Sequence, residues 1–461
     1  MLEWLREDAA CTGTKEGCAE GDCGACTVVL GQLDDAGQLQ LKPVNACIQF
    51  VPTLDGKALF SVEDLARPGA CLHPVQQAMV DHHASQCGFC TPGFVMSLWA
   101  CYQRHQRAGT LPTRQQLADD LSGNLCRCTG YRPILDAGQR MFDAPASMLD
   151  QSVVVQALRT LQAEPALGHE GAFHAPRTLT ELAALRQARP QAQLLAGSTD
   201  IGLWVNKQFR DLGEIIYLGD VTELKRVDVD HHHIHIGAAV SLEQAWRALV
   251  AEWPVLRDIW LRFASLPIRE AGTMGGNVAN GSPIGDSAPV LMALGAAVVL
   301  QQGARIRRLA LEDFYTGYMQ NRLDAGEFVQ SLEVPRARSG QQLRAYKISK
   351  RFDCDISAVC GAFAIQTDGQ TISAVRLAFG GMAATVQRAL HAETTLLGQP
   401  WTQTTLQAAM AALETDFKPL TDMRASSGYR MQVAKNLLRR CWLQTRAEDP
   451  LSEAAVNVWA R

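Results

Sequence analysis

Four cysteines near the start of the chain have a spacing that favours iron–sulfur chemistry. Cys18, Cys23 and Cys26 form the pattern Cys-x4-Cys-x2-Cys, and Cys47 follows later in the chain. Plant-type ferredoxins hold a 2Fe-2S cluster with this spacing. Glycines between the cysteines allow the segment to wrap around a cluster, whereas zinc sites more often use paired Cys-x2-Cys units. The pattern therefore predicts a 2Fe-2S cluster.

A second set of cysteines forms a Cys-x2-Cys unit, Cys87 and Cys90, and a Cys-x-Cys unit, Cys126 and Cys128. By itself this set fits a four-thiolate zinc site as well as an iron–sulfur cluster. The neighbouring ferredoxin-type segment and the unusual Cys-x-Cys unit favour a second 2Fe-2S cluster. The remaining cysteines have no ligand spacing, and we expect them to be small buried hydrophobic residues. They are Cys11, Cys71, Cys101, Cys354, Cys360 and Cys441.

Two segments in the second half of the chain could approach a nucleotide. Leu194–Asp200 is an apolar strand that enters a turn of small residues, with a helix expected over Ile201–Lys207. Gly272–Asp286 contains five glycines, which predicts a permissive loop close to a ligand. Neither segment has the Gly-x-Gly-x-x-Gly pattern, so a Rossmann fold is not supported. On their residues alone, these segments indicate only a nucleotide site.

The elements around these residues divide the chain into several domains. Apolar runs over 27–30 and 44–51 predict strands of a small β-rich domain. Helical spacing over 73–142 predicts four short helices, with Pro92 in a first helical turn. From Phe173 onward, strand-like runs alternate with helical segments, which predicts an α+β architecture.

Composition and charge exclude several classes of partner. The chain has 461 residues, 47% of them hydrophobic, and a net charge of -4 without any long run of like charges. Nucleic acid and anionic membranes are therefore not expected as partners. The longest apolar stretch, Leu291–Leu300, is about half of the roughly 20 residues of a membrane-spanning helix. The acidic start of the chain is unlike a signal peptide, so we expect a cytoplasmic protein.

Five segments together resemble the xanthine dehydrogenase family of molybdenum hydroxylases, in particular the subunit type that fuses two 2Fe-2S domains to a flavin domain. The segments are Gly17–Cys26, Gln86–Gly93, Gly123–Tyr131, Gly275–Asp286 and Lys350–Ser357.

The resemblance implies a multidomain α+β fold. The first implied domain is a plant-type ferredoxin-like β-grasp domain over 1–62, truncated at its N-terminus, and the second is an all-α four-helix 2Fe-2S domain over 63–145. After a linker over 146–171, the third is an α+β FAD-binding domain of the vanillyl-alcohol-oxidase/PCMH type over 172–337. The last is an α+β C-terminal domain over 340–450, like that of CO dehydrogenase flavoproteins. Family members carry an opening hairpin before the position of Leu2, so we expect either a misassigned start codon or a weakened first domain with an unpaired edge in its sheet.

The resemblance also assigns site residues. Cys18, Cys23, Cys26 and Cys47 would ligate the cluster nearer the flavin, and Cys87, Cys90, Cys126 and Cys128 the cluster nearer molybdenum. The FAD contacts would be Leu194, Leu195, Ala196, Gly197, Ser198, Thr199, Asp200, Ile201, Thr273, Gly276, Asn277, Asp286, Val329 and Lys347, with Phe263 stacked on the isoalloxazine. Ser198 stands where several relatives have Gly or Asn. Gln86 would reach the pterin of a partner's molybdenum cofactor.

The implied function is electron transfer. Electrons from a molybdopterin cofactor on a separate large subunit would pass through two 2Fe-2S clusters to FAD and then to NAD+, during oxidation of hypoxanthine or xanthine to urate. The family's habit is an (αβ)2 assembly. The alternatives are the same role in an aldehyde or N-heterocycle oxidoreductase, a stand-alone iron–sulfur flavoprotein diaphorase, and a zinc-stabilised scaffold.

The histidines of the chain have ordinary interpretations. His231, His232 and His233, with His235, stand between Asp228–Asp230 and a strand, so we expect a solvated hairpin turn. His82 and His83 are expected on a helix surface, and we interpret His73 in the same way.

Overall fold

The computed structural model describes residues 1–66 and 71–456 of the chain. Its first domain is a short helix, α1 (Leu2–Glu7), beside an antiparallel sheet of order β2-β1-β3. The strands are β1 (Thr27–Leu33), β2 (Leu39–Asn45) and β3 (Ala58–Phe60). Because β3 pairs only with β1 in the described residues, it forms one edge of the sheet.

The strand predicted over 44–51 is wrong beyond Asn45. The chain instead forms two 3-10 turns, η1 (Ala46–Ile48) and η2 (Val51–Leu54). Pro52 stands at the start of η2, where it cannot donate to a sheet ladder. The turn at η1 brings Cys47 back toward the other cysteines of the first set.

The second domain consists of the four helices that the sequence predicts. They are α2 (Pro74–Asp81), α3 (Thr91–Ala108), α4 (Arg114–Asp120) and α5 (Arg132–Arg140). Helix α3 is buried from Gly93 to Gln103 and forms the centre of the domain. Its N-cap is Cys90 and Pro92 lies in its first turn, so a cysteine of the second set begins the helix. The short turn η3 (Val62–Asp64) precedes this domain.

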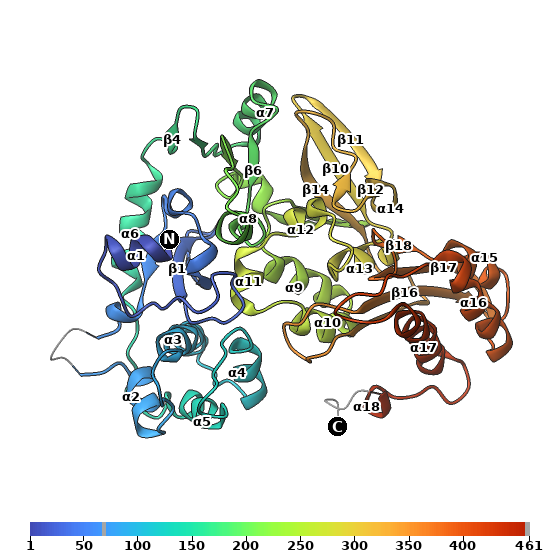
Figure 1. Ribbon diagram of the computed structural model, residues 1–461, viewed down its shortest axis with the longest axis horizontal. Helices are drawn as coiled ribbons and strands as arrows, with labels where there is room; N and C mark the ends of the chain where they lie inside the picture. The colour runs from blue at the N-terminus through green and yellow to red at the C-terminus, as the bar shows by residue number, and fades with distance from the viewer. Residues whose placement is uncertain (67–70, 457–461) are drawn as a thin grey trace.

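Helix α6 (Gln151–Gln162) connects the cysteine-bearing domains to the rest of the chain, and Figure 1 shows it beside the first domain. A small sheet of order β4-β5-β7-β6 follows. It comprises β4 (Gly168–His169), β5 (Phe173–His174), β6 (Gln193–Leu195) and β7 (Ile215–Tyr217), with helices α7 (Leu179–Ala188) and α8 (Ile201–Gln208). Strands β6 and β7 are parallel, so the turn between β6 and α8 lies at the carboxyl end of β6.

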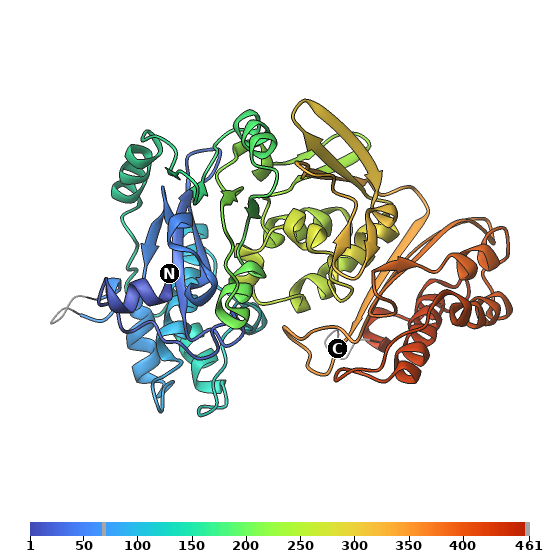
Figure 2. The ribbon, with the colours of Figure 1, turned by 45° about the horizontal axis from the view of Figure 1, so that its top comes forward.

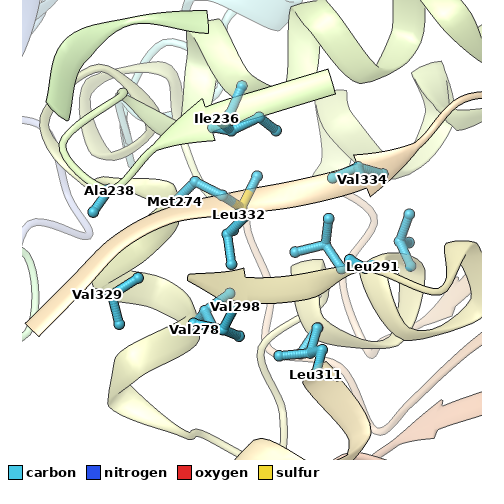
Figure 3. Packing of buried hydrophobic residues seen from close by; sticks show 14 of the residues in the cluster. Ile236, Ala238, Met274, Val278, Leu291, Val298, Leu311, Val329, Leu332 and Val334 are labelled. Atoms are coloured by element: carbon cyan, nitrogen blue, oxygen red, sulfur yellow. The ribbon is translucent and has the colours of Figure 1, made fainter. Parts of the chain in front are cut away.

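A larger sheet of order β11-β10-β14-β9-β8 completes this third domain. Its strands are β8 (Val227–Val229), β9 (His233–Gly237), β10 (Ala297–Gln302), β11 (Arg305–Ala310) and β14 (Phe328–Pro335). The helices are α9 (Leu242–Glu252), α10 (Arg257–Arg262), α11 (Leu266–Ala271), α12 (Met274–Asn280), α13 (Ser287–Leu294) and α14 (Leu311–Phe314). Two 3-10 turns, η4 (Thr222–Lys225) and η5 (Pro254–Leu256), lie between these elements. Strands β12 (Tyr315–Gly317) and β13 (Gln320–Asn321) form a separate hairpin. Figure 3 shows side chains from α12 and α13 packed against β9, β10 and β14, which fixes the two helices on the sheet.

The fourth domain lies at the opposite end of the molecule from the first (Figures 1 and 2). Its antiparallel sheet has the order β15-β16-β17-β18. The elements are β15 (Gln341–Ile348), β16 (Val359–Asp368), β17 (Thr371–Gly380), β18 (Gln387–Arg388), α15 (Leu390–Leu396), α16 (Gln403–Asp416), α17 (Ser427–Thr445) and α18 (Glu453–Val456). The four domains together confirm the predicted multidomain α+β class. No described helix has both the length and the apolarity to cross a bilayer.

Candidate redox site

The structure brings the first cysteine set together. The thiol of Cys18 lies within hydrogen-bonding reach of the thiols of Cys23 and Cys47, and the thiol of Cys47 also reaches Cys26. The backbone N–H of Cys23 points at the Cys18 sulfur at 3.4 Å. These hydrogen bonds, that of the Cys23 thiol first, hold the pKa of Cys18 well below its usual value. Such N–H donors also stabilise cluster sulfur.

The second set forms two pairs. The Cys90 thiol meets that of Cys126, and the Cys87 thiol meets that of Cys128. Burial, and then the hydrogen bond with Cys126, raise the pKa of Cys90 to about 12. Ligation by a metal would therefore have to displace a proton there.

The arrangement of the sulfurs separates a cluster from zinc. In a tetrahedral zinc site with Zn–S bonds of about 2.3 Å, all four sulfurs would lie about 3.8 Å from one another. Within the part of the chain that the structure describes, no three cysteine sulfurs lie within 4.8 Å of each other. The sulfurs of the second set instead meet in two pairs, which fits two irons that each take two thiolates. In the first set the contacts run from Cys23 to Cys18, from Cys18 to Cys47 and from Cys47 to Cys26, which also differs from four mutually close sulfurs around one zinc ion.

The loop of the first set is clamped against the helical domain. Asn124 donates through Nδ2 to the carbonyl oxygen of Gly24 at 3.1 Å and accepts from the hydroxyl of Ser97 on α3 at 2.7 Å. A methyl group added at Gly93 would collide with that same carbonyl oxygen. The two sets are thus held on surfaces in direct contact. Asn124 is a functional residue that the spacing of the cysteines alone did not reveal.

The same loop also contacts the third domain, through α8. Asn206 donates to the carbonyl oxygens of Ala19 and Cys47, at 3.1 and 2.7 Å, and Lys207 donates to that of Cys18 at 2.6 Å. Three carbonyl groups, those of Cys18, Ala19 and Cys47, are therefore fixed by one helix. Sequence reasoning missed both residues, since nothing near them in the chain marks a cluster.

The turn between β6 and α8 packs closely against a neighbouring helix. A methyl group at Gly197 would collide with the backbone of Ala271, so this turn lies directly against α11. Ser198 adopts the left-handed conformation, with φ 66°, which explains why Gly or Asn suits this position. The Ser198 hydroxyl oxygen is buried and has no hydrogen-bond partner among the described residues. A ligand oxygen at this turn would satisfy it.

The glycine-rich segment 272–286 is helical over Met274–Asn280, where its prediction as a loop is wrong, and forms a loop over 281–286, as predicted. Thr273 caps α12 by accepting from the N–H of Gly276 at 3.1 Å. Glycine is needed at 275 because a side chain there would meet the backbone of Ala238, 2.6 Å away. The side-chain oxygen of Asn277 in this helix is also buried without a partner. Two orphaned polar atoms on these segments fit a polar cofactor such as FAD.

Lys347, Asp286 and Ser357 form a buried polar cluster at the contact between the third and fourth domains. Lys347 on β15 donates from Nζ to Asp286 at 2.6 Å and to Ser357 at 2.8 Å, and Ser357 donates to Asp286 at 2.5 Å. Three segments from two domains meet here. Asp286 and Lys347 were both predicted as FAD contacts, and that assignment stays a prediction. Ser357 belongs to the Lys350–Ser357 segment, but its partners could not be read from the sequence.

Two further predicted FAD contacts, Phe263 and Val329, lie in the third domain. Phe263 directly follows α10, and its ring centroid lies 6.1 Å from that of Trp246. Arg269 donates to the backbone carbonyl oxygen of Phe263 at 3.2 Å. Val329 is only 6% exposed, in the core beside β10. Figure 3 shows Val329 pointing toward the α12 side of the sheet. Whether these residues contact a flavin stays a prediction.

Other sequence interpretations have mixed outcomes. Cys101, Cys360 and Cys441 are buried as expected, but Cys71 is exposed and Cys11 and Cys354 are only half-buried. The prediction was wrong for these three because they lie in loops outside the cores. Gln86 is exposed, as a contact to a partner requires.

His73 corrects another expectation. It is 7% exposed and not on a helix surface, and its Nδ1 caps α2 by accepting from the N–H of Val75 at 3.2 Å. A histidine before a helix has a side-chain acceptor that can replace the usual Ser or Asp. His82 and His83 at the other end of α2 are not buried, which agrees with their interpretation.

Three regions match known protein families. Residues 61–139 match the [2Fe-2S] binding domain, residues 168–337 the FAD binding domain in molybdopterin dehydrogenase, and residues 344–445 the CO dehydrogenase flavoprotein C-terminal domain. These three domains follow one another in the order of the structure. The chain therefore has the [2Fe-2S] and FAD-binding domain organisation of the molybdenum hydroxylase family.

Similar proteins agree with this family. The chain is 32% identical over 90% of its length to a xanthine dehydrogenase of Emericella nidulans, and 31% identical over 99% to one of Drosophila subobscura. It spans only 35% and 38% of these two relatives.

Among solved structures, a reconstituted CO dehydrogenase from Oligotropha carboxidovorans is 25% identical, with a TM-score of 0.55. The alignment covers 59% of this chain and 96% of the other. Quinoline 2-oxidoreductase from Pseudomonas putida 86 has the same TM-score at 21% identity, which supports the fold alone.

Proposed function

We propose that this chain is the electron-transfer subunit of a xanthine dehydrogenase. Electrons from a molybdopterin cofactor on a large partner subunit would leave through the Cys87–Cys128 set and the Cys18–Cys47 set, pass to FAD and reduce NAD+. When bound, the clusters and FAD supply the one-electron and two-electron redox chemistry. The similarity to whole xanthine dehydrogenases, together with the position of the chain over about a third of their length, supports this proposal.

The observation that carries the proposal is the position of the first cysteine loop between the other two domains. Asn124 holds the loop from the helical domain, and Asn206 holds it from α8 of the FAD-binding domain. The loop therefore adjoins both the second cysteine set and the turn at Gly197. Electron transfer through successive one-electron carriers needs cofactor sites that lie next to one another in this way.

The residues of the chain have distinct proposed tasks. The eight cysteines of the two sets would ligate the clusters. Ser198 and Thr273, with the N-terminus of α12, would orient the FAD diphosphate, because a hydroxyl and helix N–H groups can donate to phosphate oxygens. Phe263 would cover the flavin ring. Gln86, which is exposed beside Cys87, would face the partner.

The test uses the chain co-expressed with its partner. We expect Cys126→Ser and Cys47→Ser each to remove about half of the iron and one of two reduced 2Fe-2S signals in electron paramagnetic resonance. The matched control is Cys441→Ala, a buried cysteine outside both sets, which should keep both signals. Zinc in place of iron, or a single signal in the unaltered protein, would contradict the two-cluster proposal.

Substrate and acceptor are tested separately. Xanthine-dependent reduction of NAD+ should be abolished in both cysteine variants. Turnover of aldehydes or N-heterocycles but not xanthine would assign the same electron-transfer role to another molybdenum hydroxylase. NADH oxidation by the chain without any partner, and no hydroxylase activity with one, would instead identify a stand-alone diaphorase.

A further inference from the structure

The hairpin between β8 and β9 carries a group of side chains that the redox function does not use. Asp230, His233 and His235 each offer one ligand atom, and these atoms lie within 4.8 Å of one another. The hairpin turn expected from the sequence is present, since the N–H of Asp230 bonds to the carbonyl oxygen of His233 at 3.0 Å. The hairpin therefore places the imidazoles of His233 and His235 and the carboxylate of Asp230 close together on one side of the sheet.

Local structure explains why these atoms converge. His233 and His235 are two residues apart on β9, so their side chains project from the same face. The Oδ1 atom of Asp230 accepts the N–H groups of His232 and His233, at 2.6 and 2.7 Å, which fixes the carboxylate. Its Oδ2 atom is left facing Nε2 of His235 at 2.8 Å. One carboxylate oxygen thus accepts from the turn, and the other contacts the ring nitrogen of His235.

A second carboxylate lies near the other ring nitrogen of His235, beyond hydrogen-bond distance. Glu333 is the register partner of His235 on β14, and its Oε1 atom lies 3.8 Å from His235 Nδ1. Arg308 holds Glu333 through two contacts of 3.0 and 2.9 Å. Histidine ligands of metals commonly have such a carboxylate behind the nitrogen that does not bind the metal. With Nδ1 facing Glu333, Nε2 faces Asp230.

We propose that Asp230, His233 and His235 bind a divalent transition-metal ion, with Zn²⁺ as the fitting choice. Two imidazole nitrogens and one carboxylate oxygen suit Zn²⁺, whereas Ca²⁺ and Mg²⁺ require oxygen ligands. The side chains of His235 and Asp230 are 33% and 52% exposed, so an ion can reach them and water can complete the coordination. A bound ion would tie the β8–β9 turn to β9, next to the edge strand β8.

The test is zinc binding to the full chain with its clusters and flavin in place. We expect one more zinc ion per chain in the unaltered protein than in His233→Gln/His235→Gln, measured by dialysis against zinc and elemental analysis. Iron and flavin contents should be equal in the two proteins, because the hairpin contacts neither cysteine set. The matched control is His82→Gln/His83→Gln, which removes two adjacent histidines elsewhere and should retain the zinc.

X-ray absorption at the zinc edge identifies the ligands. Nitrogen and oxygen at about 2.0 to 2.1 Å, without sulfur at about 2.3 Å, is the expected first shell. Equal zinc contents in the hairpin variant and the unaltered protein, or a sulfur shell, would overturn the proposal. Because iron, flavin and electron transfer are measured independently, failure of this site leaves the redox proposal untouched.

Discussion

Lys347 and Asp286 form a buried ion pair of 2.6 Å between the FAD-binding domain and the C-terminal domain, with side chains only 2% and 1% exposed. Ser357 bonds to both, so the carboxylate has two donors. A pair this deeply buried depends on each partner, because removal of one leaves an unpaired charge in a dry environment.

Replacement of the lysine alone should therefore be costly. We expect Lys347→Met to lower the free energy of unfolding by about 3 to 5 kcal/mol, the usual cost of breaking a buried pair. The exposed pair of Arg140 and Asp143 is the control, and Arg140→Ala should cost less than about 1 kcal/mol. Thermal melting of the two variants gives the comparison.

A double variant separates structure from cofactor binding. Lys347→Met/Asp286→Leu replaces both charges by apolar groups and should recover most of the lost stability. If the two residues also contact FAD, as we propose, flavin content will stay low although the protein is stable. Full flavin content in the double variant would limit the pair to a structural role.

Ser198 offers a test of the flavin site in which stability and affinity move in opposite directions. Its hydroxyl is buried without a described partner, so Ser198→Ala should leave the flavin-free protein as stable as before or slightly more so. The same change should weaken FAD binding by about tenfold if the hydroxyl donates to phosphate. Flavin titration of flavin-stripped protein measures this.

Two further variants complete the comparison at Ser198. Ser198→Gly also relieves the left-handed backbone and should add about 1 kcal/mol of stability. Ser373→Ala removes an exposed hydroxyl on β17 of the C-terminal domain, which donates to the carbonyl oxygen of Gln366, and should not change FAD affinity. Equal affinity of Ser198→Ala and the unaltered protein would place phosphate elsewhere.

Sequence reasoning succeeded where the chemistry is local in the chain. Cys18, Cys23 and Cys26 lie on one loop, so their spacing in the chain already brings them near one another, and Pro92 after Cys90 marks a helix start. It failed where partners meet only in three dimensions. Asn206 reaches the carbonyl of Cys47 across 159 positions of the chain, and no periodicity records that contact.

The error over 272–286 has a different cause. Glycines there were interpreted as loop formers, yet Gly275 serves close helix packing against Ala238 while Thr273 caps the helix. Composition alone cannot distinguish a glycine that frees the backbone from one that admits a neighbour. The tertiary contact decides, and it overrides helix propensity.

Gly93 tests the contact between the two cysteine-bearing domains. A methyl group there would collide with the carbonyl oxygen of Gly24, so Gly93→Ala should cost about 1 to 3 kcal/mol and weaken the first 2Fe-2S signal. Gly428 is also near the start of a helix but has no atom within 4 Å of an added methyl group. Gly428→Ala should therefore be neutral or stabilising by about 0.5 to 1 kcal/mol. Melting temperature and the spectrum of the reduced clusters measure both, and equal behaviour of the two variants would contradict a steric clamp.

His73 makes the helical domain sensitive to acid. Burial lowers the pKa of this imidazole below its unfolded value of about 6.5. Below pH 6.5 the unfolded chain therefore binds the proton first, and stability falls as pH drops from 6.5 toward the lowered value, by up to about 1.4 kcal/mol per pH unit. Protonation of Nδ1 also removes the acceptor that caps α2 through Val75.

The sign of this effect can be checked with one substitution. His73→Asn keeps a capping oxygen and cannot titrate, so it should flatten the decrease in melting temperature between pH 7.5 and pH 5.5. His82→Asn, at the opposite end of α2, should keep the profile of the unaltered protein. Amide exchange at Val75 reports the cap directly and should accelerate at pH 5.5, relative to other α2 amides, only when His73 is present. A profile that is identical in His73→Asn and the unaltered protein would mean that other groups cause the acid sensitivity, because the cap itself is retained in both.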